Sequence, residues 1–451
     1  MNGPVPLPLD SVDLSFLTGG DSLVRRSVLD SGVRVLTEAV PGARSATVGF
    51  WIAVGSRDET DADRGSTHFL EHLLFKGTGT RSALDIAVSF ESVGGEHNAA
   101  TAKEYTCYYA KVRDVDLGDA VDVLTDMVTS STLDADEFET ERGVILEELA
   151  MADDDPGDVA GERLFEAVLG GHPLGRPIGG SPEHIRAAHR DEVRDHWHEH
   201  YVPGALVVSV AGAVDHDLVV AQLEAAFARA SWARGQATPV GRRTTEEAPL
   251  TQGAPLTVVR RPLEQATVLL GVPGLRATDE RRPALAVLNA VLGGGMASRL
   301  FQEIRERRGL AYSVYTFGPG YSDAGLFGLY AGCAPRNAPT VARLMLDGLE
   351  AMAADGIDDG ELRRAVGQLG GAAALALEDS DTRMNRLGRA ELATGEFVDL
   401  DESLARLGRV TGDDVRDLAA HLVRGPLSTV VVGEVDESAF PATAPAPVAT
   451  R

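Results

Sequence analysis

The chain has 451 residues, of which 44% are hydrophobic and 24% charged, as expected for a soluble globular protein with a large core and two or three domains. It carries 42 lysines and arginines against 68 aspartates and glutamates, and this net charge of −26 makes nucleic acid and acidic membrane surfaces poor partners. No apolar run approaches the roughly 18 residues of a membrane span. Without a secretory signal, and with only two distant cysteines, Cys107 and Cys333, the chain is expected to be cytoplasmic.

The first half of the chain is expected to alternate strands and helices. Continuous or alternating apolar runs favour strands, and apolar residues at helical spacing favour helices. The predicted strands span 34–37, 46–54, 96–101, 105–112 and 205–213, and the predicted helices span 65–74, 82–93, 117–130, 136–153 and 183–200. Pro156-Gly157 is expected to close the fourth of these helices.

The helix at 65–74 carries the pattern His-x-x-Glu-His, the inverse of the commoner zincin motif. On a helix, His68 and His72 lie one turn apart on a single face, and Glu71 flanks them without blocking them. Two such imidazoles can fill two corners of a tetrahedral zinc site, and a carboxylate beside them can accept a proton from activated water. The alternative is a pair of helical histidines capping an apolar face.

A second helix, over 137–149, offers the missing acidic ligand. Glu141 and Glu148 lie seven residues apart and share a face, with Ile145 between them. Carboxylates on a buried helix face need compensation, which a metal would supply. Helix spacing alone does not distinguish Glu148 from its neighbour Glu147 as a ligand.

A competing metal site is possible at the end of the helix 183–200. His196 and His200 are also one turn apart, with His198 between them, but no acidic third ligand has a comparable case. Histidines at the end of a helix also suit its dipole. We expect these residues, and His172, to be structural.

The second half is expected to repeat the order of elements of the first, after a linker rich in Gly, Pro and Thr. Its predicted strands span 256–259, 267–271, 310–317 and 427–432, and its predicted helices span 284–292, 298–307, 344–352, 359–377 and 413–422. Where the first half has His68, Glu71 and His72, the helix 284–292 has Ala286, Asn289 and Ala290, so the two halves match weakly by residues and better by the order of their elements. Gly293-Gly294-Gly295 forms either a C-cap and turn or a loop that contacts substrate. The predicted division is an N-terminal extension 1–22, a metal-binding domain 23–232, a linker 233–254, a second domain 255–438 and a disordered tail 439–451.

The motifs at 65–78, 94–109, 141–156 and 293–315 together resemble the pitrilysin/insulinase family of zinc metallopeptidases, the inverzincins, in its mitochondrial-processing-peptidase-like branch. The resemblance implies an α+β fold of two homologous domains, each a mostly antiparallel sheet with helices packed on it. It also implies one zinc ion per chain, held by His68, His72 and Glu148, with Glu71 as general base and Glu141 orienting a ligand from behind.

By the same resemblance, Arg305 and Tyr312, seven residues apart, hold the substrate carbonyl, and Asn98 and Ala99 contact the substrate backbone. The implied activity is endopeptidase cleavage of short or unfolded peptides, held as an added edge strand in a closed chamber. Longer relatives join two such units in one chain, so a homodimer with sites shared across its interface is expected here. The alternatives are a non-catalytic scaffold or partner subunit of the same family, and a different zinc hydrolase on a related fold.

Overall fold

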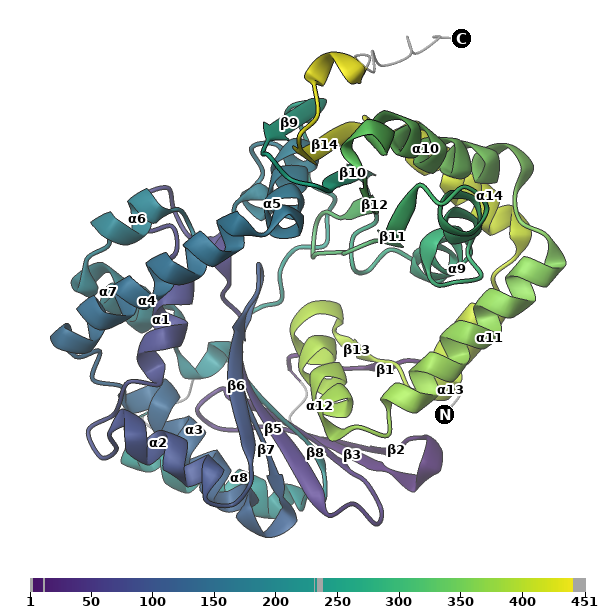
Figure 1. Ribbon diagram of the computed structural model, residues 1–451. Helices are drawn as coiled ribbons and strands as arrows, with labels where there is room; N and C mark the ends of the chain where they lie inside the picture. Colours follow the sequence, from purple (N-terminus) through teal and green to yellow (C-terminus); the bar gives the residue numbers. More distant parts are fainter. Residues whose placement is uncertain (1–2, 11–12, 231, 233–237, 441–451) are drawn as a thin grey trace. The chain divides into compact units, whose positions relative to one another are not determined.

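The computed structural model describes residues 3–10, 13–230, 232 and 238–440, which form two compact units (Figure 1). The first unit comprises Met1–Leu149, Pro177–Arg243 and Ala373–Ser403, and the second comprises Ala150–Arg176, Thr244–Ala372 and Leu404–Arg451. The predicted domains are continuous along the chain. In the structure, 150–176 from the first half belong to the second unit, and 373–403 from the second half belong to the first. The predicted N-terminal extension contributes strands to the first unit, and most of the predicted tail lies outside the described residues.

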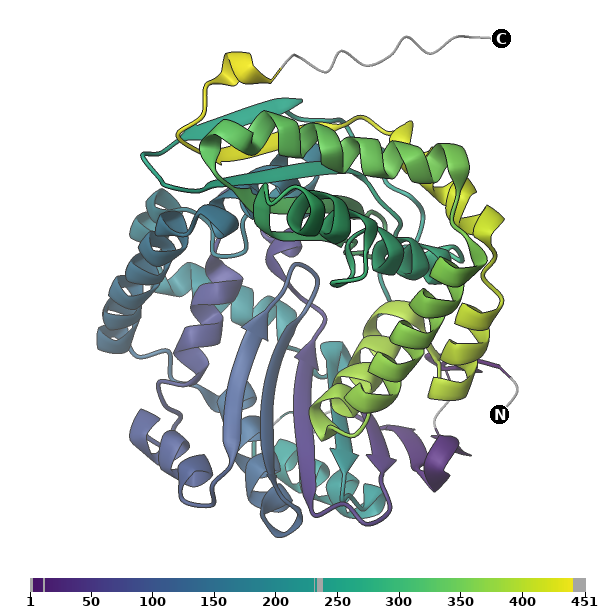
Figure 2. The ribbon, with the colours of Figure 1, turned by 45° about the vertical axis from the view of Figure 1, so that its right-hand side comes forward.

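The first unit is built on a seven-stranded sheet in which only one neighbouring pair is parallel. Its strands, in spatial order, are β2 (Asp13–Leu17), β3 (Leu23–Val28), β4 (Arg34–Ala39), β8 (Leu206–Gly212), β5 (Ser45–Ile52), β7 (Thr106–Arg113) and β6 (Glu96–Thr101). Strands β4 and β8 run parallel, and every other pair is antiparallel. The short strands β1 (Val5–Pro6) and β13 (Glu396–Phe397) pair separately. Because the sheet ends at β6, this strand has a neighbour on one side only among the residues that the structure describes (Figure 2).

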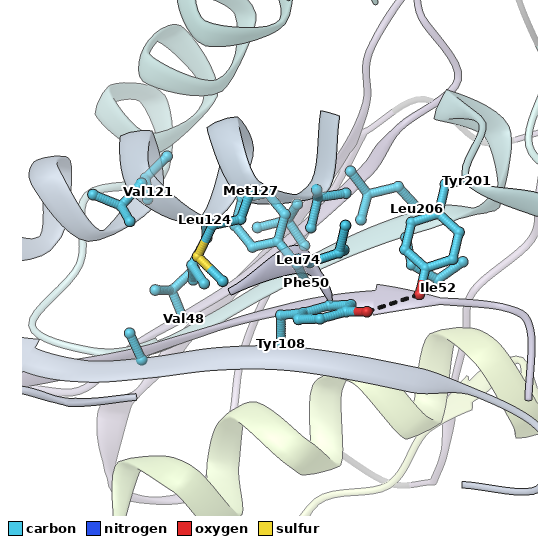
Figure 3. Packing of buried hydrophobic residues seen from close by; sticks show 14 of the residues in the cluster. Val48, Phe50, Ile52, Leu74, Tyr108, Val121, Leu124, Met127, Tyr201 and Leu206 are labelled. Atoms are coloured by element: carbon cyan, nitrogen blue, oxygen red, sulfur yellow. Dashed lines mark hydrogen bonds between the residues drawn. The ribbon is translucent and has the colours of Figure 1, made fainter. Parts of the chain in front are cut away.

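Helices cover one face of this sheet and enclose the first core. They are α1 (Ser66–Leu74), α2 (Ala83–Glu91), α3 (Leu117–Ser130), α4 (Ala135–Asp154), α6 (Pro182–Ala187), α7 (Arg190–His200) and α8 (His216–Arg229). Figure 3 shows Val48 and Phe50 of β5 packing beneath Leu124 and Met127 of α3. The hydroxyls of Tyr108 and Tyr201 form a hydrogen bond of 2.9 Å at the edge of this core.

One local prediction is wrong in this half, and one helix was not predicted. The single helix predicted over 183–200 is two helices, because the chain is extended at Ala188 and His189, and α7 starts afresh with a capping box between His189 and Glu192. Pro156 closes α4 as expected, but it also opens α5 (Pro156–Leu169), where Asp155 caps the new helix by accepting hydrogen bonds from the backbone of Gly157 and Asp158. Proline at the first position of a helix is favoured, because its missing N–H has no partner there anyway.

The second unit holds a five-stranded sheet. Its strands, in spatial order, are β11 (Ala311–Phe317), β12 (Leu326–Cys333), β10 (Ala266–Pro273), β14 (Ser428–Gly433) and β9 (Leu256–Arg260). Its helices are α5, α9 (Arg282–Gly293), α10 (Ala338–Asp355), α11 (Asp359–Ala376), α13 (Leu400–Gly408) and α14 (Gly412–Val423), and 301–307 form a π-helix where an ordinary helix was predicted. The bounds of α4, α11 and α13 cross the division between the units by a few residues.

The two sheets share one topology, as the repeat in the sequence predicts. Strands β2 and β3 extend the first sheet beyond β4 and have no counterpart in the second. In the shared part, one strand pairs in parallel with the last strand of its half (β4 with β8, β9 with β14), and that last strand then pairs antiparallel with β5 or β10. An antiparallel hairpin of two strands completes each sheet, so β11 has the same edge position as β6. The predicted α+β fold with two mostly antiparallel sheets is confirmed.

Each sheet has a second face, which is covered by a helix from the other half of the sequence. Helix α5, from the first half, packs on β10 and β14, and helix α12 (Ser380–Arg389), from the second half, packs on β8, β5 and β4. Ion pairs reinforce the second contact. Glu38 on β4 is fully buried and binds Arg383 and Arg386, and the segment after α12 places Glu391 on Arg26. Within the described residues, none of the helices combines the length and apolar character that a bilayer span requires.

Candidate metal centre

Helix α1 is fixed at both its apolar face and its first turn. Leu70, Leu73 and Leu74 are fully buried on the side that faces the core. At the start of the helix, the Glu59 carboxylate accepts hydrogen bonds from the backbone N–H groups of Gly65 (2.9 Å) and Thr67 (2.8 Å). Burial raises the pKa of Glu59 to about 7, because its effect is larger than that of these hydrogen bonds, which lower the pKa. Packing on the buried side and capping at the first turn therefore fix the position of the face that carries His68 and His72.

His68, His72 and Glu148 come together as the motif predicts. His72 Nε2 lies 3.4 Å and His68 Nε2 lies 3.7 Å from Glu148 Oε2, and the ligand atoms of all three residues lie within 4.8 Å of one another. Ligands about 2.0 Å from a tetrahedral zinc ion lie roughly 3.3 Å apart, and the two distances from the histidines to Glu148 are close to this value. Burial and the neighbouring His72 lower the pKa of His68, which favours the neutral ring that metal binding requires. Glu148 is exposed, which leaves one side of the group open to solvent.

Glu141 lies behind His72, on the side away from Glu148. Its Oε2 is 2.9 Å from His72 Nδ1, and the residue is only 2% exposed. When Nδ1 donates this hydrogen bond, the lone pair of His72 is on Nε2, next to Glu148. The arrangement of the four residues thus matches the ligands and the orienting carboxylate that the resemblance implies.

Glu71 is held by the edge strand of the sheet. Its Oε2 accepts a short hydrogen bond from the hydroxyl of Thr101, the last residue of β6. On the same strand, Asn98 is exposed, Ala99 is partly buried, and the outer edge has no partner strand among the described residues. The carboxylate beside the metal group is therefore connected directly to a strand that has a free edge.

Arg305 and Tyr312 lie together in the second unit. The Arg305 guanidinium stacks on the rings of Phe301 (4.6 Å) and Tyr312 (4.7 Å), and Tyr312 is 76% exposed. Strand β11 is bulged between Ala311 and Ser313, which turns Tyr312 outward. Arg305 belongs to the π-helix, an irregularity that is frequent at functional sites. Arg305 and Tyr312 therefore form a stacked pair, and the guanidinium and the exposed phenol can both donate hydrogen bonds.

The other histidine candidates contact other side chains in the structure. His196 is buried, with Nε2 3.1 Å from the hydroxyl of Thr67, and burial lowers its pKa to about 4. His198 stacks on Trp197, and His172 lies 3.6 Å from Asp323 in the second unit. In the part of the chain that the structure describes, His68, His72 and Glu148 are the group of His, Cys, Asp and Glu with the geometry of a metal site.

Two residues at this centre were not predicted as partners of the motif. Lys76 forms an ion pair with Glu141, and Thr101 donates to Glu71. Lys76 lies two residues beyond the end of α1, where helical spacing no longer applies, so its contact follows from the docking of α4. The contact of Thr101 depends on how β6 docks against α1, and no local pattern could have indicated it.

Family models match both halves of the chain. The family model described as insulinase (peptidase family M16) matches residues 34–181, and the model described as the inactive domain of peptidase M16 matches residues 187–369. Among solved structures, a protease from Helicobacter pylori superimposes with a TM-score of 0.81 at 22% identity, covering 95% of this chain and 100% of that one. A peptidase M16 inactive domain from Pseudomonas fluorescens gives a TM-score of 0.82 at 20% identity, covering 91% of this chain and 97% of that one. Both likenesses support the fold.

Relatives of similar length carry the sequence likeness. An uncharacterized zinc protease of Streptomyces coelicolor is 49% identical over 423 residues, covering 93% of this chain and 91% of that protein. The uncharacterized zinc protease YmxG of Bacillus subtilis is 40% identical over 400 residues, covering 89% of this chain and 96% of that protein. With two family models across both halves and relatives at this identity, the chain belongs to the insulinase family, peptidase family M16.

Proposed function

We propose that the chain is a zinc-dependent endopeptidase that cleaves short or unfolded peptides. The observation that carries the proposal is the cluster of His68, His72 and Glu148, with Glu71 on the same helix as the two histidines. One zinc ion per chain would be held by these three residues. When bound, zinc acts as a Lewis acid toward the scissile carbonyl and lowers the pKa of a coordinated water to about 7.

In this proposal, the remaining side chains move the proton and bind the substrate. Glu71 accepts the proton of the attacking water and then delivers it to the leaving amine, while the hydroxyl of Thr101 holds the carboxylate in place. Arg305 and Tyr312 supply N–H and O–H donors for the carbonyl oxygen as it gains negative charge.

The peptide would bind as an added strand on the free edge of β6, where Asn98 and Ala99 contact its backbone. Main-chain hydrogen bonds do not distinguish side chains, so we expect weak sequence preference. We further propose that the site lies in a closed chamber, as the resemblance implies. We place the activity in the cytoplasm, a proposal supported by the buried free thiols of Cys107 and Cys333.

A quenched peptide and a stable folded protein that contains the same sequence test this activity together. We expect purified protein to contain zinc and to cleave the peptide, and a chelator to abolish cleavage. An unfolded form of the protein should be cleaved and the folded form spared, because only an extended chain can add to β6. Equal rates on both forms would contradict the closed chamber, and zinc binding without any cleavage would favour the scaffold alternative.

We also propose that the working unit is a homodimer with sites shared between chains. Glu71 and the metal ligands belong to the first unit, and Arg305 and Tyr312 to the second. Glu71→Ala and Tyr312→Ala should each be nearly inactive alone. After they are co-refolded in equal amounts, half of the dimers are mixed and each mixed dimer regains one intact site, so about a quarter of wild-type activity should return. If both motifs act within one chain, mixed dimers confirmed by mass will remain inactive.

A further inference from the structure

Lys76 lies two residues beyond the end of α1, close to the two histidines of that helix. His68, His72 and Lys76 are spaced four residues apart. On α4, Glu148 lies against the two histidines, and Glu141 lies against Lys76. Lys76 Nζ lies 2.6 Å from Glu141 Oε1, while Glu141 Oε2 lies 2.9 Å from His72 Nδ1. One carboxylate therefore joins the ammonium to a metal-binding histidine.

The backbone holds Lys76 at this position after the helix has ended. The N–H of Lys76 donates to Leu73 O at 3.0 Å, and the next residue, Gly77, has a φ of 123°, which side chains other than hydrogen rarely allow. The carbonyl of Gly77 accepts a hydrogen bond from the N–H of Thr132 at 3.2 Å. These hydrogen bonds hold the backbone on both sides of Lys76, so the position of its Cα atom is fixed.

The positive charge of Lys76 balances the negative charges of the carboxylates at this centre. Glu71, Glu141 and Glu148 bring three carboxylates to the two imidazoles, and Glu141 is 2% exposed. A buried carboxylate is stable only when it is paired and hydrogen-bonded. With one divalent cation bound, the ammonium of Lys76 brings the formal charge of this group to zero. Without Lys76, Glu141 Oε1 loses its ionic partner, and the carboxylate is free to turn away from His72.

We propose that Lys76 is a positioning residue for the metal: it fixes the Glu141 carboxylate, which in turn orients the His72 ring. The inference rests on the proposed zinc site, but it does not depend on the peptide-cleaving activity. Loss of a residue that orients a metal ligand typically weakens metal binding by about 10–100-fold. We expect that change in the rate of zinc release when Lys76 is replaced.

The chain offers a matched control. Lys111 in β7 also makes a 2.6 Å ion pair, with Asp379, and the two lysine side chains are equally exposed, at 29% for Lys76 and 30% for Lys111. Zinc release into a chelator should be about 10–100-fold faster for Lys76→Met than for wild type and unchanged for Lys111→Met. Lys76→Arg, which keeps the charge, should release zinc at close to the wild-type rate. The melting temperature of each metal-free variant separates this effect from a general loss of stability.

A double-mutant cycle decides whether Lys76 acts through Glu141. If it does, adding Lys76→Met to Glu141→Gln should produce little further increase in zinc release. Additive effects of the two substitutions would overturn the proposal, as would zinc release from Lys76→Met at the wild-type rate. If Lys76→Met does not fold, the comparison of Lys76→Gln with Lys111→Gln gives the same decision. Zinc release that responds as expected in a protein that cleaves no peptide would contradict the proposed function alone.

Discussion

Glu71→Gln is expected to keep its zinc and to lose nearly all turnover, with kcat lower by about 10²–10⁴-fold. The amide has almost the shape of the carboxylate and can still accept the hydrogen bond from Thr101, but it cannot accept a proton. Because Glu71 is not among the three clustered ligands, the metal should stay bound. Metal analysis and quenched-peptide kinetics on the same preparation measure both quantities.

Two further glutamates on α4 provide the comparison. Glu147→Gln changes an exposed neighbour of the proposed ligand and should affect neither zinc nor kcat. Glu148→Gln should lose zinc, because it removes the carboxylate that lies against both imidazoles. If Glu71→Gln loses the metal and Glu148→Gln retains it, the two roles have been assigned in reverse.

His68→Ala is expected to abolish both zinc binding and cleavage. Two of three protein ligands do not hold zinc tightly, and binding at this site requires neutral imidazole nitrogens at fixed distances. The matched control is His198→Ala, which removes an exposed histidine from the competing cluster on α7 and should keep both zinc and activity. Full zinc occupancy in purified His68→Ala protein would refute the assignment, and zinc loss from the His198 variant would revive the competing site.

Local periodicity was sufficient to predict most of the elements that carry the centre. Helix α1 and helix α3 occur where the apolar spacing places them, and β6 has the predicted bounds 96–101. Such patterns succeed because one buried face imposes its period on the sequence. The break between α6 and α7 was missed, since a histidine cap is a weak signal. The start of α5 was also missed, although Asp155 followed by Pro156 is a recognisable cap.

The candidate site depends on contacts that no local pattern encodes. The spacing of His68 and His72 follows from helix geometry, but the selection of Glu148 over Glu147 required the family resemblance and then the three-dimensional structure. Glu147 is exposed and makes no contact with the imidazoles, while Glu148 lies within 3.7 Å of both. The contacts of Lys76 and Thr101 depend on the docking of α4 and β6 against α1, so only the tertiary structure identified them.

The exchange of α5 and α12 between the two sheets has a consequence for biosynthesis. The first sheet receives the cover of its second face only when residues 380–389 have been made, long after its own strands. A nascent chain released or cleaved before that point would expose Trp51, Val207 and the buried Glu38 to solvent. Domains of this size commonly fold one by one from the N-terminus, but here the first sheet is fully covered only after much of the second unit has been made. We therefore expect the interval before α12 emerges to be the period in which the unfinished sheet needs protection from aggregation.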